Sequence, residues 1–144
     1  MKLQFTVHDS VPEDEGGLVD AGLDASNAAA APLNDAAPLS CFCAPALRGR
    51  GRWCRGSHLG SCCELQQVWG DPTQRRKGIG ASLVQAFEAH ALARGCSTYD
   101  LETFSFQAPS LYRSLGYEVA LALEGFAPGI VKYTMVRRSA GHSP

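Results

Sequence analysis

The sequence has no excess of charge of either sign. Its 144 residues include 13 Lys and Arg against 14 Asp and Glu, which gives a formal net charge of -1. General nucleic-acid binding needs many cations that displace counterions from phosphates, so nucleic acid is not an expected partner. The one dense basic run, four arginines between residues 48 and 55, has no aromatic platform beside it except Trp53.

Long apolar runs are also missing. No stretch approaches the roughly 20 apolar residues that span a bilayer, so no membrane segment is expected. Residues 1–10 lack the basic-then-apolar order of a secretory signal, and we therefore expect a cytoplasmic protein. With 45% hydrophobic and 19% charged residues, the chain has the composition and length of one globular domain.

The six cysteines lack the spacing of a zinc site. Structural zinc usually takes paired ligands such as C-x2-C, whereas here the order is C-x-C, a single cysteine and then two adjacent ones. His58 adds one further potential ligand. In a reducing cytosol such residues are usually free thiols. We therefore expect no metal.

Periodicity predicts an α/β domain. Leu3–His8 alternates like a half-buried strand, and an acidic turn after Pro12 begins a helix over Glu13–Ala30, which its glycines weaken. Ile79, Leu83, Val84, Phe87 and Ala91 share one face of a helix that ends at Gly95, and Glu88 lies off that face. The other predicted elements are strands at Cys63–Trp69, Thr98–Phe104, Tyr117–Leu123 and Ile130–Val136 and a short helix from Pro109 to Leu115.

The segment Ala44–Ser61 has neither helical nor strand periodicity. Arg, Gly, Cys, Trp and Ser dominate it, so we expect a loop or a poorly formed hairpin. Two interpretations stay open: a GC-rich gene read out of frame, or a divergent loop that contacts substrate. If the segment is merely tolerated, it should be poorly ordered with few buried contacts.

An anion site is predicted at the start of the helix that follows Asp71-Pro72. Gly78 and Gly80 carry no β-carbon and let a phosphate approach the unpaired amides and positive dipole end of this helix. Arg75, Arg76 and Lys77 add positive charge. The Lys-Ser/Thr pair of a P-loop and the three-glycine dinucleotide spacing are both absent.

These residues carry a resemblance to a known family. The pattern Arg75-x-x-Gly78-x-Gly80 resembles the acetyl-CoA pyrophosphate motif of the GNAT family of N-acetyltransferases. The run from Ala108 through Tyr112 to Gly116-Tyr117 resembles that family's A-x-x-x-Y-x-x-x-G-F/Y segment. The resemblance implies a mixed, mostly antiparallel sheet flanked by helices, whose fourth and fifth strands splay apart for acetyl-CoA.

The resemblance also implies an organisation and a set of site residues. A single domain is expected over 1–144, with the first strand and helices in 1–40, an irregular part at 41–61, the cofactor-binding and catalytic part at 62–136 and a tail at 137–144. Tyr112 would face the sulfur of CoA, although a core tyrosine is the competing interpretation. Acetyl-CoA would be bound by Val68, Gly70, Arg75, Arg76, Lys77, Gly78, Ile79, Gly80, Ala81 and Ser105.

The implied reaction is acetyl transfer from acetyl-CoA to the primary amine of a small molecule by direct attack in a ternary complex. A protein or peptide amine as acceptor, and a catalytically impaired CoA-binding module, are the alternatives. Glu64, at the start of the strand that leads to the cofactor, is the candidate general base if its neighbours Cys63 and Leu65 desolvate it partly. A solvent-facing glutamate at the strand end is the competing interpretation. A water chain is the alternative proton acceptor, and a homodimer is left open. Among departures from the family, Gly70 replaces an apolar residue, Ser105 replaces an asparagine, and Asp100 places a charge in mid-strand.

Overall fold

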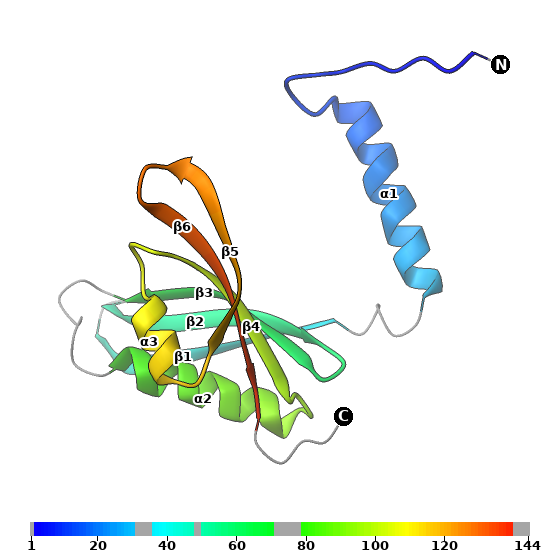
Figure 1. Ribbon diagram of the computed structural model, residues 1–144. Helices are drawn as coiled ribbons and strands as arrows, with labels where there is room; N and C mark the ends of the chain where they lie inside the picture. The colour runs from blue at the N-terminus through cyan, green and yellow to red at the C-terminus, as the bar shows by residue number, and fades with distance from the viewer. Residues whose placement is uncertain (1, 31–35, 48–49, 71–78, 140–144) are drawn as a thin grey trace. The chain divides into compact units, whose positions relative to one another are not determined.

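The computed structural model describes residues 2–30, 36–47, 50–70 and 79–139 (Figure 1). The chain divides into two compact units, Met1–Asp35 and Ala36–Pro144, and each is described by itself. The expectation of one domain over residues 1–144 therefore stays a prediction.

The first unit contains the predicted helix but not the predicted strand. Helix α1 spans Glu13–Ala29 and has three acids in its first turn, where they complement the helix dipole. The strand expected at Leu3–His8 is wrong, because this backbone has no strand structure and Leu3, Phe5 and Val7 are all exposed. An extended segment becomes a strand only when its backbone groups pair with a neighbour, which alternation alone does not supply.

The second unit is built on a six-stranded sheet with the order β1-β2-β3-β4-β6-β5. Neighbouring strands are antiparallel except β3 and β4, which are parallel. This mixed, mostly antiparallel sheet with flanking helices confirms the predicted fold. The strands are β1 (Ala37–Leu47), β2 (Arg50–Leu59), β3 (Cys62–Gly70), β4 (Thr98–Phe104), β5 (Glu118–Ala127) and β6 (Ile130–Arg138).

The segment expected to be irregular forms an antiparallel strand pair, so that prediction is wrong. β1 and β2 pair from Ala37 opposite His58 to Leu47 opposite Arg50, and β2 also pairs with β3 along its other edge. Within β2, Cys54 and Gly56 are buried. A strand paired on both edges tolerates glycine, serine and cysteine, because its tertiary neighbours outweigh the weak strand propensity of these residues.

Helix α2 (Ile79–Ala93) packs on β1 and β2 through its predicted apolar face, whose Leu83, Val84, Phe87 and Ala91 are buried. In Figure 1 it runs along the side of the sheet away from the β5–β6 hairpin. After α2, Gly95 adopts a φ of 93°, as expected of a C-terminal cap. The short helix α3 (Pro109–Ser114) follows β4 and contributes Tyr112 to the core.

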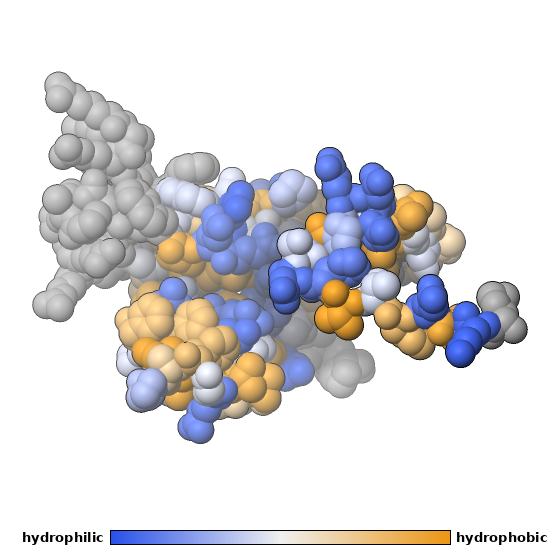
Figure 2. All heavy atoms as spheres, turned by 90° about the horizontal axis from the view of Figure 1, so that it is seen from above, coloured by the Kyte–Doolittle hydropathy of each residue, from blue (hydrophilic) through white to orange (hydrophobic). Residues whose placement is uncertain are grey.

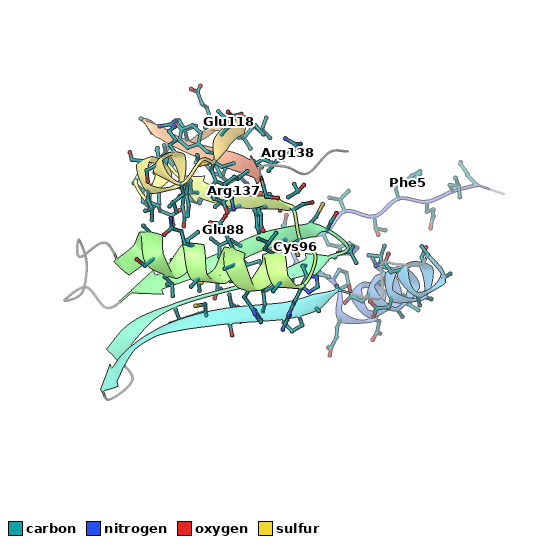
Figure 3. All side chains as sticks on the ribbon, turned by 90° about the horizontal axis from the view of Figure 1, so that it is seen from below. Phe5, Glu88, Cys96, Glu118, Arg137 and Arg138 are labelled. Carbon is teal, nitrogen blue, oxygen red and sulfur yellow. The ribbon has the colours of Figure 1, made fainter. Side chains whose placement is uncertain are left out.

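One ion pair joins α2 to β6, and the sequence pattern did not predict it. Glu88 was placed off the apolar face of α2, yet it is buried, and its carboxylate accepts a 2.6 Å hydrogen bond from Arg137 Nε. Figure 3 shows the two side chains pointing toward each other from α2 and β6. Burial raises the pKa of Glu88, and Arg137 opposes that shift. The helical period cannot reveal this partner, because Arg137 lies 49 residues away.

Removing one member of this pair should lower the free energy of unfolding more than removing both. Arg137→Met leaves a buried carboxylate without its cation, so we expect the free energy of unfolding to fall by about 3 kcal/mol. The double variant Glu88→Leu with Arg137→Met should recover most of that loss, because no isolated charge remains. Urea unfolding of both single variants and the double variant measures the coupling. Additive losses would contradict a buried, mutually dependent pair.

Candidate active site

The two parallel strands separate in mid-sheet. β3 pairs with β4 over four steps, from Cys62 opposite Thr98 to Leu65 opposite Leu101. Beyond this point β3 continues beside β2 as far as Gly70, while β4 continues beside β6 as far as Phe104. Within the described strands, the facing edges of β3 and β4 after Leu65 and Leu101 have no strand between them. This is the splay that the family resemblance implied.

A bulge coincides with the point of separation. β2 and β3 pair Gly56 with Leu65 and then Arg55 with Gln67, so Gln66 is an extra residue in β3. A β-bulge bends its strand and increases the local twist, which turns β3 away from β4. Periodicity cannot indicate this bulge, because the bulge depends on the pairing of β3 with β2.

Gly56 is required opposite this bulge. A β-carbon at position 56 would lie 1.9 Å from the Glu64 carbonyl oxygen and 2.9 Å from the Phe87 ring. The backbone of β2 therefore contacts both β3 and the side chain of α2. Gly56 lies inside the segment Ala44–Ser61, which is predicted to be irregular, and no pattern in the sequence indicates its role.

The end of β3 leads to the predicted phosphate site. Val68 is partly exposed in β3, and Gly70 is the last residue of that strand. Arg75, Arg76, Lys77 and Gly78 lie outside the described residues. α2 begins at Ile79, and its first turn holds a buried Gly80 and a half-buried Ala81. The approach of a phosphate to the amides of this turn stays a prediction.

Tyr112 lies in the core at one face of the sheet. It is 7% exposed, and its ring meets that of Tyr117 edge to face at 5.9 Å. Burial raises the pKa of Tyr112 to about 12, and the nearby Cys54 adds to the shift. The Cys54 thiol is also kept protonated, since burial raises its pKa to about 12. Tyr112 is therefore a neutral phenol that can donate a proton.

Two carboxylates occupy the other face at the separation. Glu64 and Asp100 are register partners on β3 and β4, one step before the last paired step. Their strand neighbours Cys63, Leu65, Tyr99 and Leu101 are buried, so the alternation of strands places Glu64 and Asp100 on the face away from the core.

The environment of the two carboxylates distinguishes the two interpretations of Glu64. Glu64 is exposed, as in the solvent-facing interpretation, and the half-buried carboxylate is Asp100. Burial raises the pKa of Asp100, and the negative charges of Glu64 and Glu102 add to that shift. The sequence showed Asp100 only as an unusual mid-strand charge, because the partner strand was needed to place it opposite Glu64.

Ser105 is bonded to the β5–β6 hairpin. Its hydroxyl donates to the Gly129 carbonyl at 3.3 Å and accepts from the Val131 amide at 3.1 Å. The structure thus shows a role in holding this hairpin against the end of β4. Its contact with acetyl-CoA stays a prediction.

The cysteines for which the structure gives a side-chain state form no disulfide bonds with one another. They are Cys41, Cys54, Cys62, Cys63 and Cys96. Across the described ranges, no group of three or more His, Cys, Asp or Glu side chains could hold a metal ion. None of the described helices is long and apolar enough to cross a membrane.

The parallel strands of this sheet separate beside a helix start that contains glycine. A phenol lies on one face of the sheet and carboxylates lie on the other. Together these features define the acyltransferase class of site. Residues 28–117 match the acetyltransferase (GNAT) family. The chain belongs to this family and is an acyl-CoA-dependent N-acetyltransferase.

Known relatives agree with this assignment. The blasticidin-S acetyltransferase of Streptomyces morookaense is 31% identical over 110 residues, which cover 74% of this chain and 81% of that protein. An acetyltransferase structure from Bacillus cereus, 21% identical, has a TM-score of 0.78 over 93% of this chain and 98% of its own. A structure from Agrobacterium tumefaciens named as a putative acetyltransferase, 19% identical, has a TM-score of 0.79 over 95% and 100%. The two structures support the fold.

The requirement for glycine at position 56 can be tested directly. Gly56→Ala should lower the free energy of unfolding by about 1–3 kcal/mol, the usual cost of overpacking, and should weaken acetyl-CoA binding because the bulge shifts. Urea unfolding and calorimetry measure the two effects. Gly22→Ala is the control, since its new β-carbon meets nothing within 4 Å and alanine favours the helix. Unchanged stability and cofactor affinity in Gly56→Ala would show that the bulge does not need glycine.

Proposed function

We propose that this acetyltransferase moves the acetyl group of acetyl-CoA to a primary amine of a small molecule by direct attack within a ternary complex. The observation that carries the proposal is the separation of β3 and β4, with Tyr112 on one face and the Glu64–Asp100 pair on the other. The name of the blasticidin-S acetyltransferase supports a small-molecule acceptor. Holding both reactants aligned in one gap can by itself lower the barrier by several kcal/mol.

The donor would enter along β3. The backbone of Val68 and Gly70 would hydrogen-bond the pantetheine arm as an added strand does, because this edge has left β4. The amides of Arg76, Lys77, Gly78, Ile79, Gly80 and Ala81 would bind the pyrophosphate, with the charge of Arg75 beside them. This role of the helix start follows from its dipole and its unpaired amides.

Tyr112 would protonate the departing sulfur. A thiolate leaving group needs a proton or a hydrogen-bond donor, and a phenol with a pKa of about 12 carries that proton at neutral pH. Backbone amides of β3 beyond the bulge would stabilise the carbonyl oxygen as it gains charge. The core position of Tyr112 holds its ring by contact with Tyr117.

Glu64 would accept the proton of the attacking amine. It lies on the exposed face at the separation, where an acceptor can approach from solvent. Asp100 faces it across the strand pair, and its negative charge favours a cationic amine beside both groups. We place the reaction in the cytoplasm, where thiols such as the cysteines of this chain stay reduced.

An amine panel decides between this function and its alternatives. With acetyl-CoA present, release of free CoA should rise when small primary amines are added and should stay at background with peptides. Peptide-dependent release would favour a protein amine as the acceptor. Tight acetyl-CoA binding without any amine-dependent release would favour an impaired CoA-binding module.

Loss of the Tyr112 hydroxyl should slow catalysis without weakening donor binding. Tyr112→Phe keeps the ring in the core, so we expect kcat to fall about 10²-fold while the acetyl-CoA affinity is unchanged. Steady-state kinetics and calorimetry separate the two effects. Tyr117→Phe is the matched control, since it removes the hydroxyl of the neighbouring ring. Equal losses in rate and affinity would assign Tyr112 to packing alone.

The pH dependence of kcat/KM identifies the base. The base must be deprotonated, so its protonation produces the acidic limb of the profile. If Glu64 is the base, Glu64→Gln removes that limb and lowers kcat/KM by about 10²-fold or more.

If Asp100 is the base instead, the same substitution should shift the limb. Glu64→Gln removes one negative charge that raises the pKa of Asp100, so this pKa should fall. The limb would then move to lower pH with the rate retained, and that result would remove Glu64 from the mechanism.

A further inference from the structure

Three phenylalanines form an exposed aromatic cluster beyond the proposed reaction centre. The Phe104 and Phe106 rings stack at 5.4 Å with 12° between their planes, and Phe126 meets Phe104 edge to face at 5.3 Å. Phe106 is 67% exposed and Phe126 49%. We call these three residues the aromatic platform. Figure 2 looks down on the β5–β6 hairpin and shows hydrophobic side chains gathered over it.

Hydrogen bonds hold the backbone around the platform. The Gln107 side-chain oxygen accepts from the Phe104 amide at 2.8 Å. The Ser105 amide donates to the Val131 carbonyl at 2.8 Å, and the Ser105 hydroxyl bridges Gly129 and Val131. The platform is therefore preorganised, which lowers the entropy lost when a ligand binds.

The platform continues the face that carries the proposed base. Residues four apart on a strand point the same way, so Phe104 shares its face with Asp100 and lies about 13 Å farther along β4. Glu102 lies between them and pairs with Lys132 at 3.9 Å, and the Lys132 ammonium also lies 5.5 Å from the Phe126 ring centroid. Because β3 has left β4 over this stretch, the edge of β4 that faced β3 has no described strand beside it, while β6 pairs with the other edge.

We propose that the aromatic platform binds a planar ring of the acceptor while the acceptor amine lies at Glu64 and Asp100. This inference rests on the proposed function and names the acceptor class: a primary amine joined to an aromatic ring by a spacer on the order of 13 Å. The carboxylates attract the cationic end, and the exposed Phe106 face stacks on the ring. The two groups together fix the orientation of the acceptor.

Matched amines test the platform. Phenylbutylamine and phenyloctylamine are compared with their cyclohexyl analogues by release of free CoA. Wild type should prefer phenyloctylamine over its cyclohexyl analogue by about three- to tenfold in kcat/KM. Phenylbutylamine should show less preference over its own analogue, since it is too short to reach from the carboxylates to the platform. Phe106→Leu, which stays apolar but loses the ring, should reduce the preference to about one. Leu92→Ala, an exposed apolar change on α2, should leave it intact.

Two results would overturn the proposal. One is an unchanged phenyl preference in Phe106→Leu. The other is a rise in the KM of that variant for acetyl-CoA without a rise in its KM for acetyl-pantetheine. This result would assign the platform to the adenine of the donor. Calorimetry of phenyloctylamine binding to wild type and Phe106→Leu tests the platform without turnover. Weaker binding by the variant supports the platform even if no amine is acetylated, and that lack of turnover would contradict only the proposed function.

Discussion

The approach of Gly56 to the Glu64 carbonyl is the constraint on which the proposed site depends. A β-carbon there would overlap the oxygen at 1.9 Å, so the two backbones can lie together only if position 56 has no side chain. This approach accompanies the bulge at Gln66, and the bulge coincides with the separation of β3 from β4. The opening in the sheet thus depends on one residue in a neighbouring strand, outside both recognisable motifs.

The separation places different chemistry on the two faces of the sheet. Tyr112 is buried with the core on the α2 side, while Glu64 and Asp100 are on the opposite face. In the proposed mechanism the proton donor and the proton acceptor would therefore reach the gap from opposite sides. Such an arrangement keeps the phenol away from solvent, which holds it neutral, and leaves the carboxylates accessible to an incoming amine.

The elements that the sequence predicts correctly are those with local signals. The apolar face of α2, the glycine cap at Gly95 and the short helix with Tyr112 all depend on residues within a few positions of one another. The alternation at Leu3–His8 was equally local, but a strand needs a partner, and this segment has none among residues 2–30, the described part of its unit. Periodicity predicts which face of an element is apolar, and it does not predict which elements pair.

The missed residues depend on pairing between distant segments. β2 has poor strand propensity, and its role becomes visible only once β1 and β3 lie on its two edges. Likewise, Asp100 gains significance from Glu64, a residue 36 positions earlier that the parallel pairing places opposite it. The small residues of Ala44–Ser61 suggested an irregular segment. Small residues are also needed where backbones and a helix approach closely, and this is why Gly56 is suitable there.

Arg137 also contacts the second of the two segments that resemble the GNAT family, the run from Ala108 to Tyr117, at Gly116. Besides its ion pair with Glu88, it lies over the Tyr99 ring at 4.8 Å, and a β-carbon at Gly116 would lie 3.3 Å from its Cδ atom. Gly116 also has a φ of 97°, so both its backbone conformation and the adjacent side chain favour glycine there. Through these contacts one side chain joins α2, β4, β6 and the turn after α3. That turn follows α3, the helix that carries Tyr112, and β4 keeps β6 as its partner after β3 has left. The position of the proposed proton donor and one side of the opening are thus both fixed by packing around Arg137, whereas the other side is fixed by the bulge opposite Gly56.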